Sequence, residues 1–119
     1  MAETVNNPNA PLQPAAGRRA ILPFNGALTH ENSAELKQAV LAEIKRQRSE
    51  VILDFKHVVR LDSVALEILV DLHEIMQAQG KRLKLIRVQS LCMDILMATR
   101  ILHTLNTFED LHAAITHTP

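Results

Sequence analysis

The stretch VILDFKHVVRLDSVAL, residues 51–66, decides how this chain folds. Its opening residues are mostly β-branched or large apolar side chains, and they predict a buried strand over Val51–Phe55. After a polar link, Asp62 and Ser63 are residue types that begin helices, and apolar residues recur at helical spacing beyond them. A strand therefore leads into a helix, which places the Ser63 hydroxyl in the first helical turn, near the carboxyl end of a central strand.

The predicted helix covers residues 63–79 and has two different faces, with Gly80 following as the residue that ends it. One face is apolar and the other is acidic. Neighbouring carboxylates on the acidic face indicate a solvated or partner-facing stripe, and they argue against a catalytic acid–base pair. The apolar face holds Ala65, Leu66, Leu69, Leu72, Ile75 and Met76, and the acidic face holds Glu67, Asp71 and Glu74.

The position of Ser63 has two interpretations. Backbone N–H groups in a first helical turn lack intrahelical acceptors and the helix dipole is positive there, so a phosphate on Ser63 would be tolerated. It would add about −1.5 to −2 charges beside Asp62 and Glu67, as a phosphorylation switch does. The alternative is that Asp62 or Ser63 merely caps the helix, and these residues alone favour that alternative.

Length and composition indicate one domain without a membrane or nucleic-acid surface. The 119 residues, 47% of them hydrophobic, suffice for a single core. Equal numbers of acidic and basic residues, 13 of each, give no electrostatic footprint for nucleic acid or an anionic membrane. No apolar run approaches the roughly 20 residues of a membrane span, and the N-terminus lacks a signal-peptide pattern. We therefore expect a cytoplasmic protein, with the single cysteine, Cys92, reduced and in the core.

Before the central strand, the sequence predicts a tail, a strand and a helix. Residues 1–18 are rich in proline and poor in apolar surface, so we expect a disordered N-terminal tail and a folded domain from 19 to 117. Arg19–Phe24 is predicted to be a strand that ends in an Asn-Gly turn, with Pro23 indicating either an edge position or a bulge. The following helix has Asn32 and Glu35 at capping-box spacing and runs to about Arg48.

After the central helix, alternating strands and helices continue. Residues 81–88 alternate apolar and basic side chains, which predicts a strand with one buried face and Lys84 on the other. A helix over 90–100 is apolar on more than one face, as in a docking surface or a crowded core. A brief strand at 106–108 and a helix over 109–116 follow. The fold class is α/β, with a mainly parallel or mixed sheet of about four or five strands and about four helices.

No catalytic constellation is present in the sequence. The six histidines are scattered, and none forms an H-E-x-x-H arrangement. The sequence has no G-x-S-x-G motif, no P-loop and no G-x-G-x-x-G motif. We therefore expect neither an enzyme nor a bound metal or cofactor.

Residues 61–66 follow the predicted strand Val51–Phe55 and open the predicted amphipathic helix over 63–79. In this setting they resemble the STAS domain of bacterial anti-sigma factor antagonists. The resemblance extends over about 19–116. In that family an Asp-Ser-Ser-Gly-Leu motif begins the second helix, and its phosphorylatable serine directly follows the aspartate. That serine corresponds to Ser63 here. Val64 and Ala65 replace the second serine and the glycine.

The resemblance implies a non-enzymatic switch protein in transcription regulation and signal transduction. Such a protein would bind an anti-sigma factor with a histidine-kinase-like ATPase fold through Asp62, Ser63, Val64 and Glu67. The partner would phosphorylate Ser63 and release the protein, and a metal-dependent serine phosphatase would restore binding. The alternative implied by the same resemblance is a STAS subunit that braces the ATPase of a lipid-transport ABC system, where docking is needed and phosphorylation is not.

Overall fold

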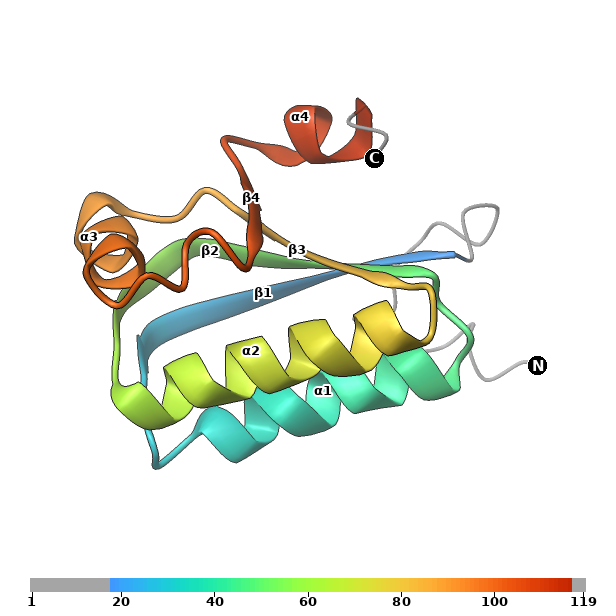
Figure 1. Ribbon diagram of the computed structural model, residues 1–119, viewed down its shortest axis with the longest axis horizontal. Helices are drawn as coiled ribbons and strands as arrows, with labels where there is room; N and C mark the ends of the chain where they lie inside the picture. Colours follow the sequence, from blue (N-terminus) through green and yellow to red (C-terminus); the bar gives the residue numbers. More distant parts are fainter. Residues whose placement is uncertain (1–17, 117–119) are drawn as a thin grey trace.

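The computed structural model describes residues 18–116, so the expected tail lies outside the described residues except for Arg18. In this part of the chain, four strands alternate with four helices (Figure 1). The elements are β1 (Arg19–Leu28), α1 (Ser33–Lys45), β2 (Glu50–Leu61), α2 (Ser63–Ala78), β3 (Arg82–Ile86), α3 (Ser90–Ala98), β4 (Asn106–Phe108) and α4 (Leu111–Thr116).

The strands form one parallel sheet in the order β1-β2-β3-β4. α1 and α2 lie side by side on one face of the sheet, and α4 lies on the other (Figure 1). α3 packs against β2 near the end of the sheet from which α2 begins. The predicted α/β class with a mainly parallel sheet is confirmed.

Two groups of buried apolar side chains stabilise these layers. Leu53 and Leu85 on the strands pack with Leu69 of α2 in the main core, as the helical and strand spacing predicts. Successive strand residues point to opposite faces of the sheet. The strand residues next to Leu53 and Leu85 therefore belong to a smaller cluster on the side of the sheet that α4 covers. That cluster consists of Ile52, Ile86 and Ala114.

β1 is longer than the sequence predicts, and the expected turn at Asn25-Gly26 is wrong. The strand continues through this pair to Leu28. Its register with β2 shifts between Pro23 and Asn25 and again just after Gly26. Gly26 has φ of 76°, a backbone conformation that favours glycine, so the pair forms a bulged segment within a strand.

β2 also extends beyond its predicted end at Phe55. Its second half, which the sequence suggests is a polar link, stays paired with β1 as far as Leu61. Val58 and Leu61 are buried there, which explains why the strand persists. Because β3 pairs only with Glu50–Asp54, the rest of β2 projects past it toward the start of α2.

The predicted capping box of α1 is wrong. Asn32 stands at the N-cap, but its side chain makes no capping hydrogen bond. Its Oδ1 accepts from the Thr29 N–H at 2.8 Å, and its Nδ2 donates to the Ala27 carbonyl at 2.9 Å. The Asn32 side chain therefore stabilises the loop before α1. It does not take part in a capping box with Glu35.

α1 ends at Lys45, before the predicted end at Arg48. Gln47 adopts a φ of 66°, which ends the helix. The Arg48 side chain turns back and donates from Nε to the buried Glu43 carboxylate at 3.0 Å. The basic segment after α1 is thus partly fixed against its own helix.

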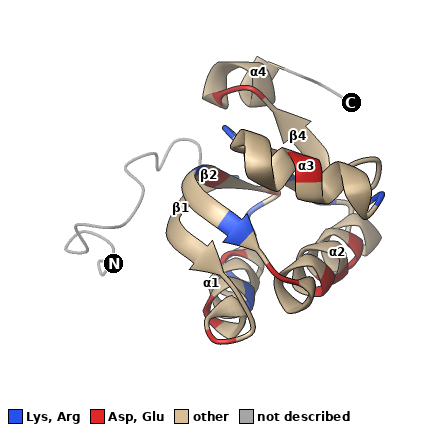
Figure 2. Ribbon diagram, turned by 90° about the vertical axis from the view of Figure 1, so that its left-hand side faces the viewer, with Lys and Arg blue, Asp and Glu red and all other residues tan. Residues whose placement is uncertain are grey.

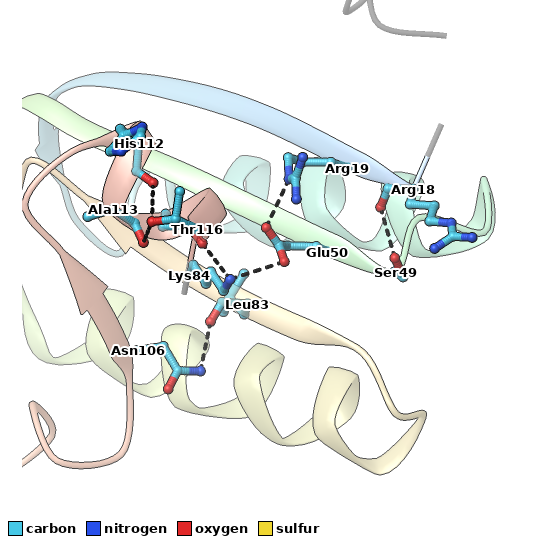
Figure 3. A network of polar contacts seen from close by, with 11 residues as sticks. Arg18, Arg19, Ser49, Glu50, Leu83, Lys84, Asn106, His112, Ala113 and Thr116 are labelled. Atoms are coloured by element: carbon cyan, nitrogen blue, oxygen red, sulfur yellow. Dashed lines mark hydrogen bonds and ion pairs between the residues drawn. The ribbon is translucent and has the colours of Figure 1, made fainter. Parts of the chain in front are cut away.

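Lys84 is buried, which corrects its predicted place on an exposed face. α4 covers that face, and Lys84 is only 2% exposed (Figure 3). Its Nζ donates to the Ala114 carbonyl at 2.7 Å and lies 3.1 Å from Glu50 Oε1. The other oxygen of Glu50 accepts from Arg19 Nε at 3.0 Å. The positive charge of Lys84 is therefore compensated by Glu50. The hydrogen bond from Lys84 to the Ala114 carbonyl links α4 to the sheet.

Replacing Lys84 by methionine should lower the free energy of unfolding by about 1–3 kcal/mol, because the buried Ala114 carbonyl loses its donor. Glu50 would keep Arg19 as its partner. Urea unfolding measures the difference. Arg82→Met, on an exposed residue of the same strand, is the control and should be nearly neutral. Equal stability of the two variants would contradict this role for Lys84.

Candidate functional site

The Asp62 carboxylate joins the start of α2 to the loop after β1. Its Oδ1 accepts from the Ala65 N–H at 2.9 Å, which makes Asp62 the N-cap of α2. Its Oδ2 accepts from the His30 N–H at 2.7 Å, and His30 Nδ1 lies 3.3 Å from the same oxygen. The Asp62 N–H donates to the Leu28 carbonyl at 3.1 Å. One residue thus fixes both chain segments at this end of the sheet.

These contacts hold the pKa of Asp62 below its usual range. The largest cause is the hydrogen bond from the Ala65 N–H, and the His30 backbone and side chain add to it. A carboxylate with a lowered pKa in the folded state stabilises the fold above the unfolded value, and that contribution is lost as pH falls through the folded value.

A carbon NMR titration of the Asp62 carboxyl should therefore have its midpoint below 3.8, the ordinary value. The His30 amide signal should shift with the same midpoint, because its N–H bonds to the titrating oxygen. In Asp62→Asn the side-chain oxygen can still accept but does not titrate, so this shift should disappear. An Asp62 midpoint at or above 3.8 would contradict the hydrogen-bonding scheme.

Ser63 is the first residue of α2 and is exposed. Its hydroxyl makes no hydrogen bond to any of residues 18–116. Because Asp62 supplies the cap, Ser63 is not needed for it. The sequence left open which of the two residues caps the helix, and the geometry assigns the cap to Asp62.

The predicted partner-binding residues all lie in the N-cap and first turns of α2. Val64 and Glu67 are exposed with Ser63, whereas Asp62 is partly buried by its hydrogen bonds. The intervening Ala65 points into the core. The structure therefore presents a small outward surface around Ser63.

Sequence reasoning missed part of this site, namely the loop after β1. Leu28 and Leu61 are register partners, so the carboxyl ends of both strands meet beside Ser63. Loops that follow the carboxyl ends of parallel strands lie at the same edge of the sheet. The predicted parallel sheet could therefore have indicated that the loop after β1 lies beside Ser63. An open hollow of about 480 Å³ lies between the two segments. Its lining residues are Thr29, His30, Glu31, Arg60, Leu61 and Asp62.

The described residues show no sign of a metal site or a membrane span. Between residues 18 and 116, no three His, Cys, Asp or Glu side chains gather so that they could hold a metal ion. None of the described helices is both long and apolar enough to cross a membrane. Cys92 is buried, as expected, and burial raises the pKa of its thiol. The start of α2 is therefore the candidate site with the clearest geometry.

A model of the STAS domain family matches residues 7–114. The chain belongs to the STAS domain family. The match begins inside the segment 1–18, so the domain boundary at residue 19 stays a prediction. Among curated protein sequences, none matches this STAS domain closely enough to count as a relative.

Solved structures share the fold of this STAS domain. A crystal structure of a candidate anti-sigma factor antagonist from Thermotoga maritima superposes with a TM-score of 0.74 at 21% identity, covering 80% of this chain and 82% of that one. The anti-sigma factor antagonist SpoIIAA in its unphosphorylated form gives a TM-score of 0.64 at 13% identity, covering 82% of this chain and 86% of that one. At these identities the likeness concerns the fold.

Proposed function

We propose that this STAS domain is an anti-sigma factor antagonist whose binding is switched by phosphorylation of Ser63. The observation that carries the proposal is the exposed Ser63 hydroxyl, which makes no hydrogen bond within residues 18–116 and adjoins a helix cap made by Asp62. A kinase substrate needs an accessible hydroxyl whose modification leaves the fold intact. The shared fold with proteins described as anti-sigma factor antagonists, one of them in an unphosphorylated form, supports the proposal.

In this proposal the partner is an anti-sigma factor with a histidine-kinase-like ATPase fold. It contacts Asp62, Ser63, Val64 and Glu67, and its bound ATP supplies the phosphoryl group. The Ser63 oxygen attacks the γ-phosphorus, the bond to ADP breaks and the hydroxyl proton is released. This STAS domain is the acceptor in that reaction. It needs no cofactor and catalyses no step itself.

The phosphate would act on the complex more strongly than on the fold. At the first residue of α2 it would lie at the positive end of the helix dipole, where backbone N–H groups have no acceptor within the helix. At an interface it would stand beside the ionised Asp62 and near Glu67, so binding would require desolvation of adjacent negative charges. Phosphorylation therefore releases the partner. A metal-dependent serine phosphatase in the cytoplasm would restore the hydroxyl and the complex.

The proposal is tested by incubating the purified chain with the purified anti-sigma factor kinase of its source organism and ATP, and mapping phosphate by mass spectrometry. We expect phosphate on Ser63 and none on the Ser63→Ala variant. Ser90 is also an exposed serine at the first position of a helix, so Ser90→Ala is a matched control that should be phosphorylated like wild type. Phosphate elsewhere, or none, would refute the switch.

A second candidate function is favoured by Val64, an exposed apolar side chain directly after Ser63. An apolar contact at this position suits permanent docking, as in a STAS subunit that braces the ATPase of a lipid-transport ABC system. Such a role predicts tight binding to that ATPase with no phosphate on Ser63. Measuring binding to both purified ATPases separates the two candidates.

A further inference from the structure

Exposed apolar side chains are concentrated at the end of the domain that carries Ser63. Four of the five large ones among residues 18–116 belong to the end of β2, the start of α2 and α3, and the fifth belongs to α4. The exposed fractions are 48% for Val59, 37% for Val64, 56% for Leu91, 59% for Met97 and 39% for Ile115.

α3 is firmly attached beside the strand that leads to Ser63. Cys92 and Leu96 are buried in the main core, and the Cys92 thiol lies 3.5 Å from the Val58 carbonyl. Gln89, just before the helix, donates from Nε2 to the Lys56 carbonyl. These contacts place α3 against the part of β2 that projects past β3. Val59 belongs to that same part, three residues before Asp62.

The outward side of α3 is unusual for a solvent-facing helix. Such a face normally carries several charged side chains, whereas the only charged residue in α3 is Asp94. Figure 2 looks at this end of the molecule and shows α3 crossing it with one acidic segment. Leu91, Met97 and Ala98 are exposed on the helix. Several exposed apolar side chains on one short helix with a single charge indicate an interaction surface.

We propose that Val59, Leu91 and Met97 form a second contact surface for the same anti-sigma factor that covers Ser63. This inference rests on the proposed function and extends it. A stable protein complex buries roughly 800 Å² on each partner, more than one helical turn around Ser63 offers. A partner seated on Ser63 and Val64 must therefore extend over neighbouring elements. The apolar side chains on α3 and β2 provide that extension, and they remain uncharged when Ser63 is phosphorylated.

Photo-crosslinking with the purified anti-sigma factor kinase and ADP tests the surface. A benzophenone amino acid is placed in turn at Val64, Met97 and Ile115, all exposed apolar positions. We expect crosslinks to the kinase from positions 64 and 97 and none from 115. In calorimetric titrations, Met97→Ser and Leu91→Ser should each weaken binding about tenfold, and Ile115→Ser should not change it.

The outcomes distinguish this inference from the proposed function. A crosslink from position 64 but not from 97 would overturn the α3 surface and leave the Ser63 interface in place. No crosslink from either position would refute both. A crosslink from 97 to a second copy of this chain, or equal crosslinking from 115, would also overturn the α3 surface.

Discussion

Replacing Leu69 by alanine is expected to lower the free energy of unfolding by about 2–5 kcal/mol. Leu69 is fully buried on α2, within the cluster formed by the sheet and its two long helices. The substitution removes several buried carbons and leaves a cavity that the closely packed surroundings fill only in part.

Urea unfolding followed by circular dichroism gives this difference. Leu91→Ala is the matched control, because it removes the same atoms from an exposed helical position and should change stability by less than about 0.5 kcal/mol. A nearly neutral Leu69→Ala would mean that α2 does not present this face to the core.

Substituting Ser63 by aspartate should leave the fold intact and weaken the complex with the anti-sigma factor about ten- to hundred-fold. A carboxylate in the first turn of a helix is stabilised by the dipole, so α2 should form normally. At the interface, however, the new charge next to Asp62 must be desolvated, at a cost on the order of 1–3 kcal/mol. Ser63→Ala adds no charge and should bind like wild type while resisting phosphorylation.

Calorimetric titration of the purified anti-sigma factor kinase with each variant reads these affinities. Gln79→Glu is the control, because it adds one negative charge at the far end of the same helix. It should bind like wild type. If it weakened binding as much as Ser63→Asp, net charge rather than the position of Ser63 would explain the effect.

The parts of the fold that depend on local patterns were predictable from the sequence. α2 begins at Ser63 as expected and ends one residue before the predicted Gln79. Gly80 follows with φ of 74°, as a residue that ends a helix should. Leu69 and Leu85 are buried because helical and strand spacing fix which residues share a face.

The errors arose where distant segments decide the structure. Lys84 lies on a strand whose second face is covered by α4, about 30 residues later, and no alternation pattern contains that information. Asn25-Gly26 is a frequent turn pair, yet pairing with β2 keeps it in a strand. In both places tertiary contacts overrode a correct local preference.

The candidate site was predictable only in part for the same reason. Asp62 and Ser63 both suit a helix start, and local sequence does not determine which of them caps it. The Asp62 carboxylate is held in its capping position by a second hydrogen bond, which it accepts from the His30 N–H. His30 belongs to a loop 32 residues earlier in the chain. Only the parallel register of β1 and β2 brings that loop to Ser63.

The most direct measurement compares one protein in two states. The wild-type chain, unphosphorylated and then stoichiometrically phosphorylated on Ser63, is titrated into the purified anti-sigma factor kinase with ADP. Phosphorylation should weaken binding at least about tenfold, and treatment with a metal-dependent serine phosphatase should restore it. Equal affinity of the two forms would contradict a switch at Ser63.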